Sequence, residues 1–248
     1  MRSLRLFALL ALGLGACADA GETTAPAAIL ADSEAAADHW DAAERTYRVT
    51  VTNLTTGQPL SPGVVVTHTK HVSIFEKGRR ASDGIREIAE NGDPSTAAAE
   101  LAGARGIHDV RTTNAPVGRV GGTAFPTSLS LEIDAARSAR YLSLSMMLIC
   151  TNDGFAGLEG VKLPGGFREE VYYADAYDAG TEVNDEVAGS IVPPCFGIGP
   201  VTGLVGGGGR TAEDRVVRHH RGIKGIADLT SAHDWRGPVA RIVVQRIR

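Results

Sequence analysis

Three acidic residues stand in loops that follow predicted strands. Asp153 comes soon after the strand predicted over residues 141–149, and Asp178 and Glu182 flank a short turn after a second strand. Neighbouring carboxylates repel one another unless a cation lies between them, and Ca²⁺ takes several carboxylate and carbonyl oxygens as ligands. Gly180 allows the backbone to turn so that both later acids can face one centre. The pattern permits a metal site, although on spacing alone solvated loop acids are the more common arrangement.

Other residue types that do chemistry are not arranged for catalysis. His68 and His71 are three residues apart on or beside a predicted strand, so their side chains point to opposite faces and joint metal binding is disfavoured. We interpret them as structural or surface histidines. The chain has neither a Gly-x-Ser-x-Gly nucleophile elbow nor a His-Glu-x-x-His motif. The sequence therefore predicts no enzyme, with a metal-assisted hydrolase at the acids as the minor alternative.

A basic segment lies near the C-terminus. His219 and His220 stand among Arg215, Arg218 and Arg221, a composition that predicts a solvated basic patch. Contact with an anionic glycan or a lipid headgroup is the alternative. The whole chain carries a net charge of −4, so a nucleic-acid partner has no electrostatic support.

Two of the three cysteines are candidates for a disulfide. Cys17 belongs to the N-terminal segment, which leaves Cys150 and Cys195. In an oxidising compartment two remaining cysteines suggest one bond, which for a loop of this length contributes about 4 kcal/mol of stability. Two buried free thiols are the alternative. Neither cysteine has a His or Cys at metal-ligand spacing, so a zinc site is not expected.

The predicted elements are mostly strands. Alternation of apolar and polar residues predicts a strand over 47–55, and further strands are expected over 62–67, 128–133, 141–149, 169–173 and 239–247. After the second strand, Ile85, Ile88 and Ala89 recur at helical spacing, and Ser95 is expected to cap a second short helix over 96–102. Short strands, 30 glycines and the absence of repeated βαβ units predict a mainly all-β antiparallel sandwich with a short helical insert.

The N-terminal residues have the character of a secretion signal. Arg2 and Arg5 precede an apolar run, Leu6–Leu14, which is too short to span a bilayer. The run ends in Leu-Gly-Ala-Cys, which resembles a bacterial lipobox and predicts lipid attachment at Cys17; a plain secretory signal is the alternative. Ala18 after the cysteine, where inner-membrane proteins carry Asp, favours the outer membrane. The predicted organisation is a signal peptide over 1–16, a tether over 17–44 and one domain over 45–248.

Several strings point to one family. The most specific is Tyr177-Asp178-Ala179-Gly180-Thr181-Glu182, which is preceded by Ser143–Ile149, Asn152-Asp153 and Phe155. The other matching strings are Pro62–His68, Phe75–Gly78, Ala81–Gly84, Ala89–Gly92 and Ala240–Ile247. In this order they resemble the spondin domain, the N-terminal module of F-spondin and the body of mindin, over roughly residues 45–248. The resemblance is closest to bacterial secreted members.

The resemblance implies a C2-like antiparallel β-sandwich with a Ca²⁺ site at one end. The metal acids of the family map onto Asp153, Asp178 and Glu182, where Glu182 replaces an Asp common in animal members and its longer arm is expected to alter the geometry. A fourth acid maps near Asp134, with Glu132 as a rival position. The residue after Asp153 is usually aromatic and here is Gly154, which is expected to cost packing but no ligand.

The function expected from these features is a non-catalytic binding or adhesion module of the cell envelope. It would be attached by lipid, in the outer membrane, or secreted, with structural Ca²⁺ in the loops at one end of the sandwich. A protein or glycan of the envelope or matrix would be the partner. The alternative is a structural envelope protein that acts as a spacer and has no specific partner.

Overall fold

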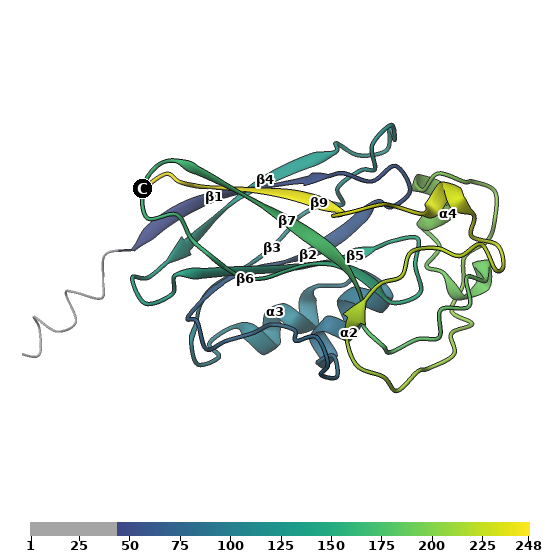
Figure 1. The fold of residues 1–248 in the computed structure, drawn as a ribbon, viewed down its shortest axis with the longest axis horizontal. Coiled ribbons are helices and arrows are strands. Elements are labelled where there is room, and N and C mark those ends of the chain that lie inside the picture. The colour runs from purple at the N-terminus through teal and green to yellow at the C-terminus, as the bar shows by residue number, and fades with distance from the viewer. Residues whose placement is uncertain (1–43) are drawn as a thin grey trace, which may run out of the picture. The chain divides into compact units, whose positions relative to one another are not determined.

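Nine antiparallel strands form two layers that share one long strand (Figure 1). This is a computed structural model that describes residues 44–248, so the predictions for residues 1–16, for Cys17 and for nearly all of the tether lie outside the described residues. The strand order is β3-β2-β5-β6-β7-β9-β1-β4, and β8 pairs with β7. The strands are β1 (Arg45–Asn53), β2 (Leu60–His68), β3 (Ile107–Thr112), β4 (Ser128–Ala135), β5 (Tyr141–Leu148), β6 (Gly154–Lys162), β7 (Glu169–Asp178), β8 (Arg218–His219) and β9 (Ala240–Arg246). The prediction of an all-β sandwich with a short helical insert is confirmed.

Strand β7 joins the two layers. Its first part, Glu169–Ala174, pairs with β9, and its last part, Asp175–Asp178, pairs with β6. In Figure 1 it runs diagonally from the layer of β1, β4 and β9 to the layer of β2, β5 and β6. The predicted strand over 169–173 therefore continues to Asp178, and this continuation carries a candidate site residue from one sheet into the other.

The main core lies between the layers. Alternation along β1 directs Tyr47, Val49 and Val51 inward, and Leu142 and Leu144 of β5 belong to the same buried cluster. All five side chains are almost fully buried. Burial of each aliphatic side chain of this size contributes about 1.5–3 kcal/mol, so the alternation that predicts these strands also supplies the core.

Two helices cover the outer face of one layer. In α2 (Asp83–Asn91), Ile85 and Ile88 pack with Val64 and Val66 of β2, and Figure 1 shows α2 and α3 on that side of the molecule. Gly92 ends α2 in the left-handed conformation with φ 67°, which glycine adopts at no steric cost. The remaining helices are α3 (Ser95–Leu101) and α4 (Cys195–Ile198), with one-turn 3₁₀ segments at Ala188–Ser190 and Ser231–His233.

The predicted cap of α3 is wrong. Pro94 occupies the capping position, Ser95 is the first helical residue, and no side chain caps this end. The Asp93 carboxylate instead accepts the backbone N–H of Ser95 at 2.9 Å. Pro94, immediately before the helix, therefore determines that α3 begins at Ser95.

Three strands, β3, β6 and β8, have no counterpart in the sequence prediction. Strand β6 contains Gly154, Gly157 and Gly160, and glycine in the interior of a strand weakens that strand. Gly157 is required by packing, because a Cβ there would lie 2.6 Å from the Phe75 ring and 2.8 Å from the Tyr177 ring. The Phe75 and Tyr177 rings therefore explain why residue 157 is glycine. Because glycine lowers strand propensity, the same residue explains why β6 is not predicted from the sequence.

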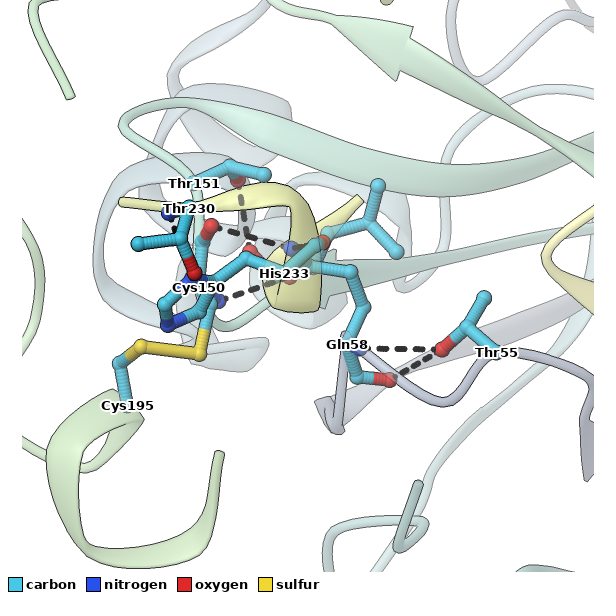
Figure 2. The surroundings of a disulfide bond; sticks show 8 residues. Thr55, Gln58, Cys150, Thr151, Cys195, Thr230 and His233 are labelled. Carbon is cyan, nitrogen blue, oxygen red and sulfur yellow. Dashed lines mark hydrogen bonds between the residues drawn. A yellow bond between two sulfur atoms is a disulfide. The ribbon is translucent and has the colours of Figure 1, made fainter. Parts of the chain in front are cut away.

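A disulfide ties α4 to the end of β5. Cys150, two residues beyond β5, is bonded to Cys195, as the sequence analysis predicts. The Gln58 side chain holds the same loop, since its amide donates to the carbonyls of Cys150 and His233 at 3.1 and 2.6 Å and accepts the Cys150 N–H at 2.9 Å (Figure 2). This end of the sandwich is therefore fixed both covalently and by hydrogen bonds. Within residues 44–248, no helix has the length and the apolar character that crossing a bilayer requires.

Candidate functional site

The register of two strands brings two of the predicted acids together. Gly154 at the start of β6 pairs with Asp178 at the end of β7, so Asp153, one residue before β6, lies beside Asp178. The backbone continues this pairing, because the Ala179 N–H donates to the Asp153 carbonyl at 3.1 Å. Acids that are 25 positions apart in the sequence therefore become neighbours through an antiparallel pair.

Asp153 is buried and only half satisfied. Its side chain has 0% exposure. Oδ2 accepts the backbone N–H groups of Thr181 and Glu182 at 2.7 and 3.0 Å, whereas Oδ1 accepts no hydrogen bond from any residue that the structure describes. Burial, with the neighbouring Asp178 charge, raises the pKa of Asp153 to about 6 against the lowering effect of these hydrogen bonds.

Glu182 has two buried carboxylate oxygens with no hydrogen bond from residues 44–248. Its Oε1 lies 3.1 Å from Arg210 Nε, which is an ion pair by distance, although the N–H does not point along the contact. Burial raises the pKa of Glu182 to about 8, and the positive charge of Arg210 only partly offsets this. A buried carboxylate without hydrogen bonds is costly, so a proton or a cation in addition to Arg210 would stabilise this residue.

Asp178 is satisfied by the protein itself. Oδ1 accepts the Gly180 N–H at 2.9 Å, while Oδ2 accepts Asn184 Nδ2 at 2.8 Å and Arg218 at 2.9 Å. Burial raises the pKa of Asp178, and Arg218 counteracts that rise. Asp178 thus contributes negative charge next to Asp153 but has no free oxygen.

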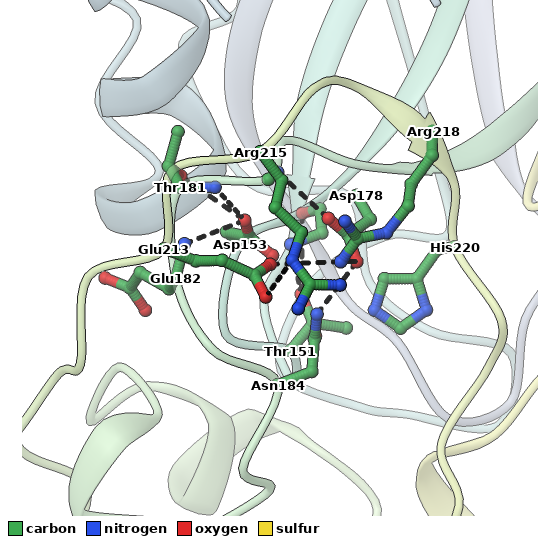
Figure 3. Close-up of polar contacts among 12 residues, drawn as sticks. Thr151, Asp153, Asp178, Thr181, Glu182, Asn184, Glu213, Arg215, Arg218 and His220 are labelled. Carbon is green, nitrogen blue, oxygen red and sulfur yellow. Dashed lines mark hydrogen bonds and ion pairs between the residues drawn. The ribbon is translucent and has the colours of Figure 1, made fainter. Parts of the chain in front are cut away.

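The three acids, which we call the acidic cluster (Asp153, Asp178 and Glu182), do not converge on a single point. Figure 3 shows the Glu182 carboxylate turned away from Asp178. A metal site needs several ligand atoms close together. Among the described residues, a search for three His, Cys, Asp or Glu with ligand atoms within 4.8 Å of one another finds Cys150, Cys195 and His233 and not the acidic cluster. The two sulfur atoms of that group are joined in the disulfide. A cation between Asp153 and Glu182 would require the longer Glu182 arm to rotate.

Two glycines shape the loops of the acidic cluster. Gly180 has φ 74°, and a Cβ at this position would lie 2.8 Å from the Arg215 backbone, so the predicted turn needs glycine here. At Gly154 a Cβ would lie 2.5 Å from Thr151 Oγ1, and that hydroxyl accepts the Gly154 N–H at 2.9 Å. Gly154 stands where an aromatic residue is usual, and the Thr151 side chain occupies the space next to it.

Asp134 and Glu132 are not brought to the acidic cluster. Asp134 pairs in register with Thr46 near the start of β1, and its carbonyl accepts the hydroxyl of Thr67, which pairs with Leu142 near the start of β5. Asp153 follows the end of β5, so the length of that strand separates Asp134 from it. The Asp134 carboxylate accepts Thr46 Oγ1 at 2.7 Å. Glu132, on the same strand β4, forms an exposed ion pair with Arg48 at 3.1 Å.

Two arginines of the site are absent from the predicted set. Arg210 spans from Glu182 to the end of α2, where it donates to the Glu90 carbonyl at 2.9 Å. Arg218 pairs with Asp178 and Glu213, so its prediction as part of a solvated basic patch is wrong. Both arginines reach the acids from the segment after α4, and no local spacing signals such a contact.

The histidines of the sequence analysis have structural surroundings. His68 is fully buried and bonds Ser143 Oγ and the Thr69 carbonyl, each at 2.8 Å, which confirms its structural interpretation. The His220 ring packs against Trp235 with 5.0 Å between ring centroids. Burial and the nearby Arg218 lower the pKa of His220 to about 4, so it is neutral at physiological pH and adds no charge to a basic patch.

These features define an all-β sandwich with a buried, incompletely satisfied acidic cluster at the disulfide-bonded end. The Spondin_N family model matches residues 50–186, which is more than half of the chain, and the chain therefore belongs to the Spondin_N family. The match includes all three acids of the cluster and ends at Glu186. Comparison with curated proteins finds no relative that matches. Family membership indicates a non-catalytic module.

Proposed function

We propose that the protein is a non-catalytic binding module of the cell envelope whose acidic cluster holds a structural Ca²⁺ ion. The observation that carries this proposal is the set of three buried carboxylate oxygens without hydrogen bonds, Oδ1 of Asp153 and both oxygens of Glu182. Ca²⁺ prefers carboxylate oxygens and tolerates irregular geometry. A bound cation would compensate the charge that burial otherwise disfavours, as the raised pKa of both residues reflects.

Asp153 and Glu182 are the proposed ligands, and Asp178 has a different role. Because both Asp178 oxygens already accept hydrogen bonds from Gly180, Asn184 and Arg218, this residue would supply negative charge and orient Arg218. The chemistry supplied by the ion is charge neutralisation that joins the loop before β6 to the loop after β7. Rigid loops at one end of the sandwich then form the surface that meets a protein or glycan partner.

Titration calorimetry tests the site directly. Ca²⁺ and Mg²⁺ are titrated into EDTA-stripped protein, the Asp153→Asn/Glu182→Gln double variant, and Asp134→Asn, which removes a carboxylate at the far end of β5. We expect one Ca²⁺ per chain in the wild type and in Asp134→Asn, and none in the double variant. Loss of binding in Asp134→Asn, or folded wild type that binds no Ca²⁺, would overturn the calcium proposal.

A structural spacer without metal is the second candidate, and one observation favours it. Arg210 and Arg218 already lie 3.1 and 2.9 Å from acidic oxygens of the cluster, so the protein carries cations of its own at this site. A wild type that melts at the same temperature in Ca²⁺ and in EDTA would support this candidate.

Lipid attachment at Cys17 is a separate part of the proposal. It rests on the Leu-Gly-Ala-Cys string and predicts a processed N-terminus at the cysteine. Mass spectrometry of the N-terminal peptide from membrane fractions, beside Cys17→Ala, tests it. An unmodified N-terminal peptide in the wild type would leave a secreted module, whose partner can be sought in extracts with Ca²⁺ or with EDTA.

A further inference from the structure

A second site lies beside the disulfide, where a cavity of about 470 Å³ opens between segments that are distant in the sequence. Its walls come from the start of β2, the end of α2, the segment between β3 and β4, the end of β5 and the segment that carries α4. Met147 and Ile149 form one wall and Pro193, Pro194 and Ile198 another. This volume lies in the range of small-molecule pockets, which are mostly apolar and carry few polar groups.

The walls suit an apolar ligand and disfavour an extended peptide. Four of the lining residues are prolines, namely Pro62, Pro116, Pro193 and Pro194. Proline has no backbone N–H, so these walls offer few of the hydrogen bonds by which a bound peptide strand is held. The disulfide between Cys150 and Cys195 joins the wall at β5 to the wall at α4, which fixes the cavity before any ligand enters.

Arg210 is the charged residue among those that line the cavity. It donates to Asn91 Oδ1 at 2.7 Å and to the Glu90 carbonyl at 2.9 Å. These contacts use two of the five N–H groups of a guanidinium, and the buried Nε makes no hydrogen bond within residues 44–248. The guanidinium is thus held in place among the lining residues, 3.1 Å from a Glu182 oxygen and 3.9 Å from a Glu90 oxygen, with N–H groups that no hydrogen bond within the described part of the chain uses.

The other polar groups at the rim are already occupied. Ser61 Oγ donates to the Pro62 carbonyl and accepts the Met147 N–H at 2.9 Å, and the Asn91 amide donates to Glu87 at 2.8 Å. A ligand therefore meets apolar walls and one cation. We propose that this pocket binds a small apolar molecule that carries a carboxylate, with the Arg210 guanidinium as the partner of that carboxylate.

Displacement of the dye anilinonaphthalene sulfonate, an apolar anion, tests the proposal. Octanoate and 1-octanol compete with the dye against the full chain in EDTA, so that the result does not depend on the calcium site. We expect octanoate to bind about tenfold more tightly than octanol, since a charge-assisted hydrogen bond contributes at least this factor. Equal binding of the two competitors would overturn the carboxylate part.

Matched variants locate the site. Ile198→Trp fills the cavity and should abolish displaceable dye binding, whereas Ile226→Trp makes the same change at a side chain that is 62% exposed and should bind as the wild type. Unchanged binding in Ile198→Trp would show that the dye binds elsewhere and would overturn the site. Arg210→Gln should remove the preference for octanoate, and Arg221→Gln, the same charge change outside this pocket, should keep it.

A fifth variant keeps the test decisive if Arg210→Gln does not fold. Glu182→Gln leaves Arg210 in place and removes the carboxylate that lies 3.1 Å from its Nε. Octanoate should then bind several-fold more tightly than to the wild type, with octanol unchanged. An octanoate affinity that stays the same or falls in folded Glu182→Gln would overturn the role of Arg210.

Discussion

Two buried glutamates, four residues apart in one loop, are treated by the fold in opposite ways. Glu186 is 3% exposed, and its oxygens accept the N–H groups of Lys224 and Ile226 at 2.7 and 2.9 Å. Glu182 is 2% exposed, and its oxygens accept no hydrogen bond from residues 44–248. The protein thus satisfies one carboxylate with its own backbone and leaves the other incompletely compensated.

The difference separates a structural acid from a site acid. Glu186 has φ 57°, a conformation that costs a non-glycine residue energy, and its carbonyl also accepts the N–H groups of Asp228 and Leu229. Four hydrogen bonds therefore hold the segment 224–229 onto one residue, which explains why that backbone conformation persists. Glu182 accepts no such hydrogen bonds from the described residues and has Arg210 at 3.1 Å as its charged neighbour, which is why we propose Glu182, and not Glu186, as a cation ligand.

The largest effect is expected for the disulfide between Cys150 and Cys195, which joins the end of β5 to α4. The Cys150→Ala/Cys195→Ala double variant should lose about 4 kcal/mol of unfolding free energy in urea, because the disulfide closes a long loop. Its Ca²⁺-dependent stabilisation should survive, since the β6–β7 register positions Asp153 and Asp178 without the disulfide. A variant as stable as the wild type would contradict the stabilising role of the disulfide. A variant that remains folded but no longer responds to Ca²⁺ would contradict the independence of the calcium site from the disulfide.

The next effect sharpens the role of Glu182. In Ca²⁺ at about 100 times the dissociation constant, binding stabilises a folded protein by about 3 kcal/mol. Glu182→Gln should lose most of this increment in a thermal melt. Its stability in EDTA should stay close to that of the wild type, because the variant loses the ion pair with Arg210 together with the cost of burying the carboxylate charge. An undiminished response to Ca²⁺ would show that Glu182 is not a ligand.

The matched change at Glu186 should lower the stability itself and leave the response to Ca²⁺ unchanged. A glutamine amide accepts at its oxygen but presents N–H groups at the other position, so Glu186→Gln loses one of two charge-assisted hydrogen bonds. We expect a loss of about 2 kcal/mol that is the same in Ca²⁺ and in EDTA. A loss seen only in EDTA would mean that the two glutamates are not as different as their contacts indicate.

The contrast between Glu182 and Glu186 also shows which features of the molecule can be predicted from the sequence. Alternation at Tyr47, Val49 and Val51 suffices for β1, because a half-buried strand imposes a period of two. The placement of the three acids after strands and beside a glycine turn can also be predicted, but only the resemblance to the spondin domain distinguishes them from solvated loop acids. The satisfied state of Glu186 is not predictable, because its donors, Lys224 and Ile226, come from a distant loop whose path depends on the whole fold.

The arginines are missed on the same grounds. Arg210 and Arg218 reach the cluster from the segment after α4; composition predicts a solvated patch for Arg218 and gives no role to Arg210. Only the pairing of β8 with the end of β7, where Arg218 stands opposite Asp178, brings one of them to an acid. Long-range pairing therefore decides how the cluster is neutralised, and one sequence without its fold does not reveal it.

Above about pH 7, beyond the raised pKa of about 6 of Asp153, the pH dependence of stability should report mainly Glu182. Its pKa is raised to about 8 in the folded protein, so between the unfolded and folded values the folded state binds more protons, and stability falls as pH rises. Below that range, His220 with its lowered pKa has the opposite effect. In EDTA we expect a loss of about 1–2 kcal/mol between about pH 7 and 8.5, and Ca²⁺ or Glu182→Gln should flatten the curve. A slope that persists in Glu182→Gln would assign it to another group.

The smallest effect is expected at Asp134, the acid that the fold keeps at the far end of β5. Its carboxylate accepts the Thr46 hydroxyl at 2.7 Å and lies 3.5 Å from Arg111, and its side chain is partly exposed. Asp134→Asn retains an acceptor oxygen for Thr46, so the loss should stay below about 1 kcal/mol, and the melting response to Ca²⁺ should match that of the wild type. If Asp134→Asn instead removed that response, a carboxylate separated from Asp153 by a whole strand would control the cation, and the assignment of Ca²⁺ to Asp153 and Glu182 would fail.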